Sequence, residues 1–224
     1  VYDLQPKASL SPQAQQLERK QDAFAVYNCK TIVLKDKSLL REATQLQQYL
    51  QSIGWEMKLT DKAAAGELFI ELSLGKVKAA QHENEAYQLD VNVANLKLVA
   101  NTAHGIFNGM QTLKQLLRSG TMIDAVSITD WPAFSWRGYM IDVGRNYMSM
   151  PLLKQQIDVM AANKLNIFHF HATEDIAWRI AIKQYPQLTA PEHMLRNKGM
   201  YYSEAEIKEL INYCKDRHIT FVPE

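Results

Sequence analysis

Strand-like and helix-like segments alternate regularly from residue 137 to the carboxyl terminus, and this pattern constrains the fold more than any other feature. Residues 137–144 (RGYMIDVG) and 165–173 (LNIFHFHAT) are almost continuously apolar, as is typical of strands buried on both faces. Pro151 opens a helix between them, and a capping box at Ser203 opens another before a third strand at 218–224 (HITFVPE). This order predicts a parallel sheet joined by right-handed crossovers.

Charged side chains follow the end of each predicted strand in this region. Arg145 follows the first strand, Glu174 and Asp175 follow the second, and Glu224 follows the third. Catalytic groups in parallel α/β folds collect at the carboxyl ends of the strands. We therefore expect these side chains to share one rim of the sheet.

The first 130 residues show a different pattern. Short strands are expected at 31–34, 67–74, 87–93 and 96–100, and the second and third of these alternate apolar with polar residues, the period of a half-buried antiparallel strand. One helix is expected over 38–53, and another has its apolar face at Ile106, Met110, Leu113 and Leu117 and a stop at Gly120. We predict a small α+β domain over 1–130, followed by a second domain over 131–224.

The composition is that of a globular protein and excludes several classes of partner. Hydrophobic residues make up 47% and charged residues 22%, and 25 Lys plus Arg against 24 Asp plus Glu give a formal charge of +1. A balance of this kind favours neither nucleic acid nor an anionic membrane. No apolar run approaches the roughly 20 residues of a membrane helix. Cys29 and Cys214 fall in different predicted domains, so we expect free thiols.

Three stretches carry a resemblance to a known family. WRGYMIDVGRNYMS, LNIFHFHATEDIAWRIAIKQYPQLT and YYSEAEIKELINYCKDRHITFVPE resemble, in order and spacing, the opening of the catalytic barrel of glycoside hydrolase family 20, the β-N-acetylhexosaminidases. The stretch EAYQLDVNVANLKLVANTAHGIFNGMQTLKQLL is similar to the end of the α+β domain before that barrel. The resemblance implies a non-catalytic amino-terminal α+β domain followed by the first three βα units of an incomplete TIM (β/α)8 barrel, because a complete barrel has eight such units.

The resemblance also implies an activity, which is hydrolysis of terminal non-reducing β-linked N-acetylhexosamine (GlcNAc or GalNAc) from a glycan or glycoconjugate. Retaining catalysis would be assisted by the substrate's own 2-acetamido group and would need no metal or organic cofactor. Arg145 matches the family arginine that binds two ring hydroxyls, a fork geometry that lysine lacks. Glu174 stands where the family has an aspartate that supports the general acid, and Asp175 keeps its family identity. Capping of the loop is the alternative role for Asp175.

His169 and His171 alternate with Phe170, so both are expected to point to one side of the strand. They are either structural groups bonded to neighbouring strands or, for His171, a supporting part of the site. An H-x-H at a strand end also binds zinc in amidohydrolase-like barrels, but there the motif lies on the first strand, and no further ligand cluster follows here, so we predict no metal site. Trp178 and Arg179 are expected to pack the rim.

The family's adjacent Asp-Glu pair would lie beyond Glu224. We therefore expect this chain to be an inactive fragment of a longer enzyme. The main alternative is a complete non-catalytic module that binds carbohydrate or acts as a scaffold, and a less favoured alternative is a metal-dependent amidohydrolase-like barrel. The sequence begins at Val1 without a leader pattern, and the resemblance implies a periplasmic, secreted or lysosome-like location. In a sheet of only three barrel strands, the strands at 139–143 and 219–222 each have one edge without a neighbouring strand, and Met140, Phe168 and Phe221 are expected to lack the barrel interior that would cover them. Exposed strand edges and apolar side chains predict self-association.

Overall fold

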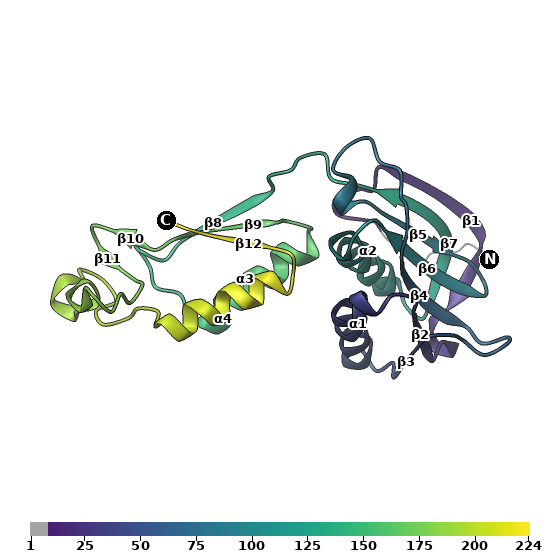
Figure 1. Cartoon of the computed structure of the whole chain (residues 1–224), viewed down its shortest axis with the longest axis horizontal. Coiled ribbons are helices and arrows are strands. Elements are labelled where there is room, and N and C mark those ends of the chain that lie inside the picture. Colours follow the sequence, from purple (N-terminus) through teal and green to yellow (C-terminus); the bar gives the residue numbers. More distant parts are fainter. Residues whose placement is uncertain (1–8) are drawn as a thin grey trace. The chain divides into compact units, whose positions relative to one another are not determined.

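The computed structural model describes residues 9–224, which divide into a first unit ending at Ser135 and a second unit, Trp136–Glu224 (Figure 1). The expectation about a leader concerns residues before position 9, which lie outside the described residues. The two units are described separately below.

The described part of the first unit forms a seven-stranded mixed sheet with two α-helices on one face (Figure 1). The order across the sheet is β1-β7-β5-β6-β4-β2-β3. The strands are β1 (Gln16–Ala25), β2 (Thr31–Leu34), β3 (Lys58–Thr60), β4 (Phe69–Leu74), β5 (Tyr87–Val91), β6 (Asn95–Ala100) and β7 (Met122–Asp130). The helices are α1 (Leu40–Ser52) and α2 (Ala103–Leu116), and short 3-10 turns lie at Val26–Asn28, Lys37–Leu39, Glu83–Glu85 and Leu117–Ser119.

Glycine lets α2 lie directly on the sheet. A Cβ added at Gly105 would overlap the carbonyl oxygen of Ala86, and one at Gly109 would overlap the side chain of Leu98. Thr102 caps the amino-terminal end of this helix, and its side chain accepts hydrogen bonds from two backbone N–H groups of the first turn. The expected α+β layer is confirmed, and the core lies between the sheet and the two helices.

One strand direction expected from the sequence is wrong. β4 pairs in parallel with both of its neighbours, β2 and β6, whereas β5 is antiparallel to β6 and β7 as expected. The alternation in β4 arises because the helices cover only one face of the sheet. Alternation reports one-sided burial, which a parallel strand also shows when its other face meets solvent.

The second unit contains the predicted parallel sheet. Its order is β12-β9-β8, formed by β8 (Gly138–Asp142), β9 (Ile167–His171) and β12 (Thr220–Pro223). Helices α3 (Met150–Ala162) and α4 (Glu204–Lys215) form the crossovers, and the capping box at Ser203 is present as predicted. Two short antiparallel strands follow β9, namely β10 (Thr173–Glu174) and β11 (Ala177–Trp178). Two 3-10 turns come next, at Pro186–Thr189 and Pro191–His193.

Burial in this sheet is one-sided, which corrects two expectations. β8 is not buried on both faces, since Met140, which pairs with His169 of β9, is 52% exposed. Phe168 is fully buried rather than uncovered, because it shares with Phe170 the face on which α3 and α4 lie (Figure 1). The residues that alternate with these phenylalanines therefore occupy the open face.

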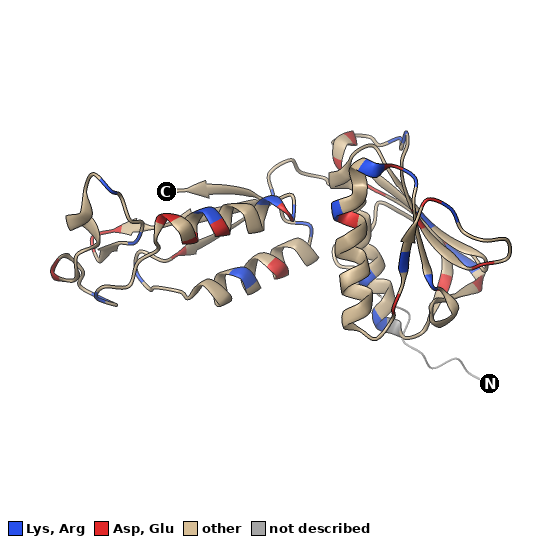
Figure 2. Cartoon of the chain, turned by 60° about the horizontal axis from the view of Figure 1, so that its bottom comes forward, with Lys and Arg blue, Asp and Glu red and all other residues tan. Residues whose placement is uncertain are grey.

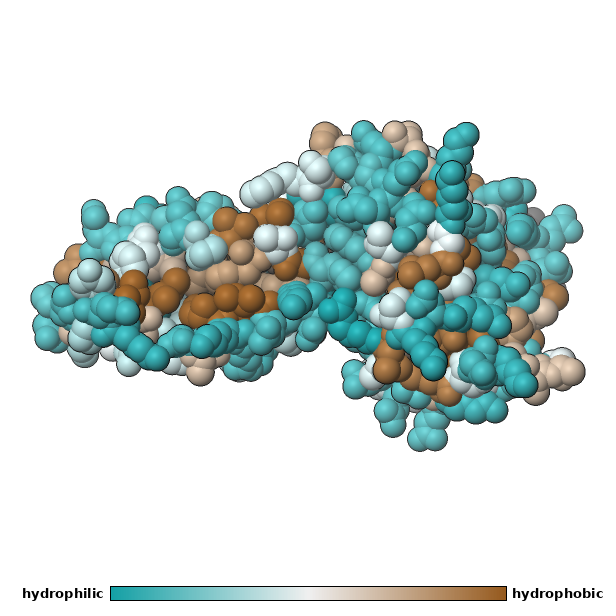
Figure 3. All heavy atoms as spheres, in the orientation of Figure 1, coloured by the Kyte–Doolittle hydropathy of each residue, from teal (hydrophilic) through white to brown (hydrophobic). Residues whose placement is uncertain are grey.

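The surfaces agree with the composition. Acidic and basic residues are interspersed over both units (Figure 2), and hydrophobic side chains reach the surface of the second unit (Figure 3). Exposed large hydrophobic residues of that unit include Met140, Leu152, Val159 and Ile211. Over residues 9–224, none of the helices has the length and apolar character needed to cross a bilayer. Cys29 and Cys214 are buried free thiols, as expected.

Candidate functional site

The predicted rim forms at the carboxyl ends of the three parallel strands. Asp142 is the last residue of β8, and Arg145 lies in the turn that follows. His171 ends β9, Glu174 lies in β10, and Glu224 follows β12. The crossover topology thus gathers side chains from distant parts of the sequence, as sequence reasoning expected.

Arg145 is held between two carboxylates. Its backbone N–H donates to Asp142 Oδ1 at 2.9 Å, its Nη1 forms an ion pair with the same carboxylate, and its Nη2 forms an ion pair with Glu174. The hydrogen bond to Asp142 and the charge of Glu174 raise the pKa of Arg145. Burial raises the pKa of Asp142, but the hydrogen bonds from Arg145 outweigh that effect and the net pKa is lowered. The arginine side chain remains 56% exposed and open to a ligand.

The two histidines of β9 converge on Glu224. His169 Nε2 lies 2.6 Å and His171 Nδ1 3.0 Å from Glu224 Oε2, and His171 Nε2 lies 3.2 Å from Glu174 Oε1. The hydrogen bond to Glu224 raises the pKa of His171, and the hydrogen bonds from His171 and His169 lower the pKa of Glu224. Both histidines therefore point to one side of the strand, as predicted. Their bonds to a residue beside β12 match the structural alternative.

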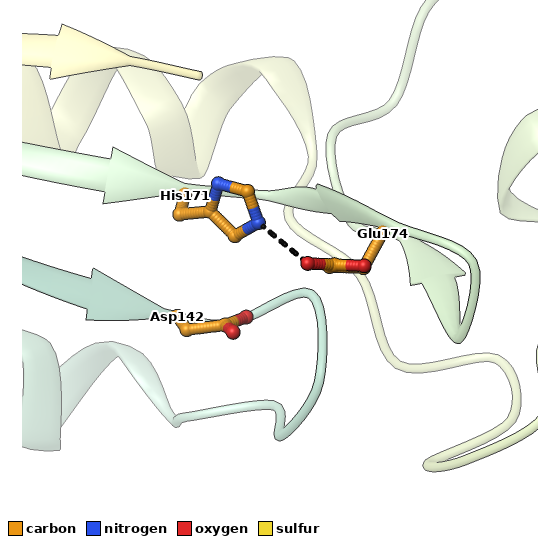
Figure 4. A group of neighbouring side chains, drawn as sticks. All are labelled: Asp142, His171 and Glu174. Carbon is orange, nitrogen blue, oxygen red and sulfur yellow. Dashed lines mark hydrogen bonds and ion pairs between the residues drawn. The ribbon is translucent and has the colours of Figure 1, made fainter.

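Three of these residues carry donors that suit a metal ion. Ligand atoms of Asp142, His171 and Glu174 lie within 4.8 Å of one another (Figure 4). The two carboxylates already bind a cation, the guanidinium of Arg145. The H-x-H pair does not form this cluster, because His169 turns to Glu224. The arrangement is that of an arginine held by acids and supported by a histidine.

Close packing at Gly144 brings the two carboxylates together. A Cβ at Gly144 would lie 3.1 Å from Glu174 Cβ, 3.2 Å from Glu174 Cγ and 3.4 Å from Asp142 Oδ1. The turn after β8 can therefore lie against the stem of Glu174. Asp175 is exposed at the same rim, and its backbone N–H donates to Glu174 Oε2 at 3.3 Å.

Arg179 is fully buried and organises the loops beside the rim. Its Nε donates to Val143 O at 3.0 Å, and its two terminal nitrogens donate to four more backbone carbonyls, those of Gly144, Arg196, Asn197 and Met200. Burial lowers the pKa of this arginine. Trp178 Nε1 donates to Ile180 O at 2.6 Å. Both residues pack the rim in the way expected from the sequence.

Sequence reasoning did not select Asp142 as a site residue. The signal in the sequence was the spacing between Asp142 and Arg145. An acid at the end of a strand can form an ion pair with an arginine three residues later, because the turn after the strand brings the two side chains together. Sequence reasoning did place Glu224 at the rim. It did not foresee that one carboxylate would bind both histidines, because strand register decides that contact.

Comparisons with known proteins agree over nearly the whole chain. The family description "Glycosyl hydrolase family 20, domain 2" matches residues 7–131, and "Glycosyl hydrolase family 20, catalytic domain" matches residues 134–224. A beta-hexosaminidase of Porphyromonas gingivalis is 32% identical over 96% of this chain and 30% of its own length. A beta-hexosaminidase of Vibrio furnissii is 30% identical over 96% of this chain and 37% of its own length.

Solved structures show the same likeness. The exo-β-N-acetylglucosaminidase of Vibrio harveyi, solved with N-acetylglucosamine, superposes with a TM-score of 0.85 at 26% identity, covering 100% of this chain and 37% of its own. The β-N-acetylhexosaminidase of Streptomyces coelicolor gives 0.83 at 26% identity, with 97% and 46% covered. The chain thus spans between about a third and a half of the length of these relatives. Its second unit corresponds to the first part of their catalytic barrel, and the chain belongs to glycosyl hydrolase family 20.

Proposed function

We propose that these residues belong to an enzyme that hydrolyses terminal non-reducing β-linked N-acetylhexosamine from glycans or glycoconjugates. The observation that carries the proposal is Arg145, held by two carboxylates at the strand-end rim while more than half of its side chain stays exposed. A guanidinium fixed in this way presents a planar fork of donors to neighbouring hydroxyls. Relatives named beta-hexosaminidase and a neighbour solved with N-acetylglucosamine support the same sugar class.

The proposed chemistry is retaining and assisted by the substrate's acetamido oxygen, so the protein supplies a general acid and a carboxylate that orients the acetamido group. Arg145 would bind ring hydroxyls, and Glu174 with His171 would hold that arginine and set the local charge. Asp175 would stabilise the loop through its backbone contact with Glu174. Nowhere in the 224 residues is an aspartate followed directly by a glutamate, the order of the family's acid pair, so we propose that this chain alone is inactive.

The test compares two proteins, residues 1–224 and an enzyme of the relatives' length that carries them. We expect the longer protein to release p-nitrophenol from its β-N-acetylglucosaminide, with or without a chelator, and the 224-residue chain to release none. Loss of activity with the chelator and its return with zinc would favour the amidohydrolase-like alternative. Turnover by the 224-residue chain would refute its assignment as inactive.

A non-catalytic carbohydrate-binding role is the second candidate, favoured by a rim that is formed without the family's acid pair. Titration of N-acetylglucosamine into the 224-residue chain, followed by NMR, separates the two. Binding as tight as that of a longer, catalytically active protein would support the binding module. Weak binding restricted to residues near Arg145 supports the enzyme part.

Two further properties belong to this proposal. A location outside the cytoplasm is proposed from the resemblance, and fractionation of producing cells would test it. β8 and β12 are the edges of the described three-stranded sheet, and Met140 is exposed on β8, so the 224-residue chain is proposed to self-associate. Light scattering that shows a stable monomer at high concentration, with slow amide exchange along β12, would contradict this.

A further inference from the structure

We propose that Asp142 is a positioning residue that orients Arg145 for sugar binding, a role that rests on the function proposed above. Asp142 contacts Arg145 at two levels. Its Oδ1 accepts the backbone N–H of Arg145 at 2.9 Å, and its carboxylate pairs with the guanidinium Nη1 of the same residue. One side chain therefore fixes both the turn that carries the arginine and the far end of the arginine itself.

Glu174 completes a clamp on the guanidinium from another element. It binds Nη2, and its Oε1 lies 3.2 Å from His171 Nε2, so β9 and β10 together hold its position. A carboxylate on each terminal nitrogen defines the plane of the guanidinium. Glu174 has one methylene more than aspartate. Its Cβ and Cγ lie against Gly144, where a Cβ would be 3.1 Å and 3.2 Å from them.

The clamp leaves donors for a ligand. An arginine has five N–H donors, and one ion pair at each terminal nitrogen leaves a second hydrogen on each of them, together with the Nε hydrogen. Two neighbouring ring hydroxyls can accept from such a fork. An exposed arginine without the clamp would lose more rotamer freedom when a sugar binds, so preorganisation raises affinity.

The clamp is also an alternative to a metal at the same residues. Asp142, His171 and Glu174 have suitable donors, but both carboxylates are already bound to a cation that the chain supplies. The two acids therefore serve the arginine. The single positive charge of Arg145 balances only one of the two negative charges of Asp142 and Glu174, so this group keeps a net negative charge without an added ion.

The test is a double-mutant cycle in an enzyme of the relatives' length that carries these residues. Asp142→Asn keeps an oxygen for the backbone N–H but removes the charge, and we expect kcat/KM to fall about tenfold, mainly through KM. Arg145→Gln should cost on the order of a hundredfold. The double variant should be no worse than Arg145→Gln alone, because Asp142 acts only through the arginine.

Asp158→Asn is the matched control. Asp158 also binds an arginine, with its Oδ1 2.7 Å from Arg217 Nε, but it lies on α3 and Arg217 lies just after α4. This variant should leave kcat/KM unchanged. A full tenfold loss on adding Asp142→Asn to Arg145→Gln would overturn the positioning role, as would a normal kcat/KM in Asp142→Asn alone. Undiminished activity in Arg145→Gln would instead refute the proposed function of the arginine.

Discussion

Replacing Arg179 by methionine should destabilise the second unit by about 3–5 kcal/mol. Methionine has a similar length but no donors, so the variant leaves five backbone carbonyls without the guanidinium. Each hydrogen bond from a charged donor contributes about 1.5–3 kcal/mol, and the cost of burying the guanidinium offsets part of the total. Water can reach some of the loop carbonyls in the variant, which lowers the sum further.

The loss should be visible as a change in both stability and local exchange. For a unit of this size, each 1 kcal/mol lowers the midpoint of thermal unfolding by roughly 4–8 °C, so a fall of more than about 12 °C is expected. Hydrogen exchange should accelerate at Tyr202, whose N–H donates to Arg179 O at 2.7 Å, and across residues 186–200. Denaturant unfolding followed by circular dichroism gives the free energy, and exchange mass spectrometry gives the location.

Arg196→Met is the control, because the Arg196 side chain is exposed and donates to Asn146 Oδ1, while its backbone carbonyl stays in place for Arg179. Its effect should be below about 0.5 kcal/mol. Arg179→Lys should fall between wild type and Arg179→Met, since an ammonium has three donors and no fork. A loss below 0.5 kcal/mol in Arg179→Met would refute the view that this buried arginine organises the loops.

Three other changes test the rim and its support. The hydrogen bond with Glu224 raises the pKa of His171, so NMR titration should find this pKa above the ordinary value for histidine, and Glu224→Gln should lower it. The stability that this bond contributes is complete below the pKa of His171 in the unfolded chain, and it disappears as the pH rises through the pKa of His171 in the folded chain. Gly144→Val should separate Glu174 from the turn after β8 and weaken the binding of N-acetylglucosamine by about tenfold. Titration of the sugar into variant and wild type measures this, and equal helical content of the two proteins shows that the variant is folded. Ser203→Ala removes the side-chain cap of α4 and should cost about 1 kcal/mol in chemical denaturation, whereas an unchanged midpoint would show that the cap contributes nothing.

Local patterns were sufficient for most of the second unit. The capping box at Ser203, the helix opened by Pro151 and the apolar run into His171 are local signals, and each predicted an element that the structure contains. The rim followed from topology, because parallel strands place their carboxyl ends at one edge. β1, β3 and β7 were not predicted in the first unit. β1 has mostly exposed residues and a weak apolar pattern, and β3 is only three residues long.

The sequence by itself determined the family, the parallel direction of the strands in the second unit and that the two histidines of β9 share one side, because these depend on motif spacing and on the two-residue period of a strand. Only the tertiary structure decided that β4 is parallel, that Phe168 is covered and that Asp142 holds Arg145. The direction of β4, the covering of Phe168 and the pairing of Asp142 depend on which elements meet in space. Alternation and composition read along one chain contain no such information, because they record how often a residue is buried and not what buries it.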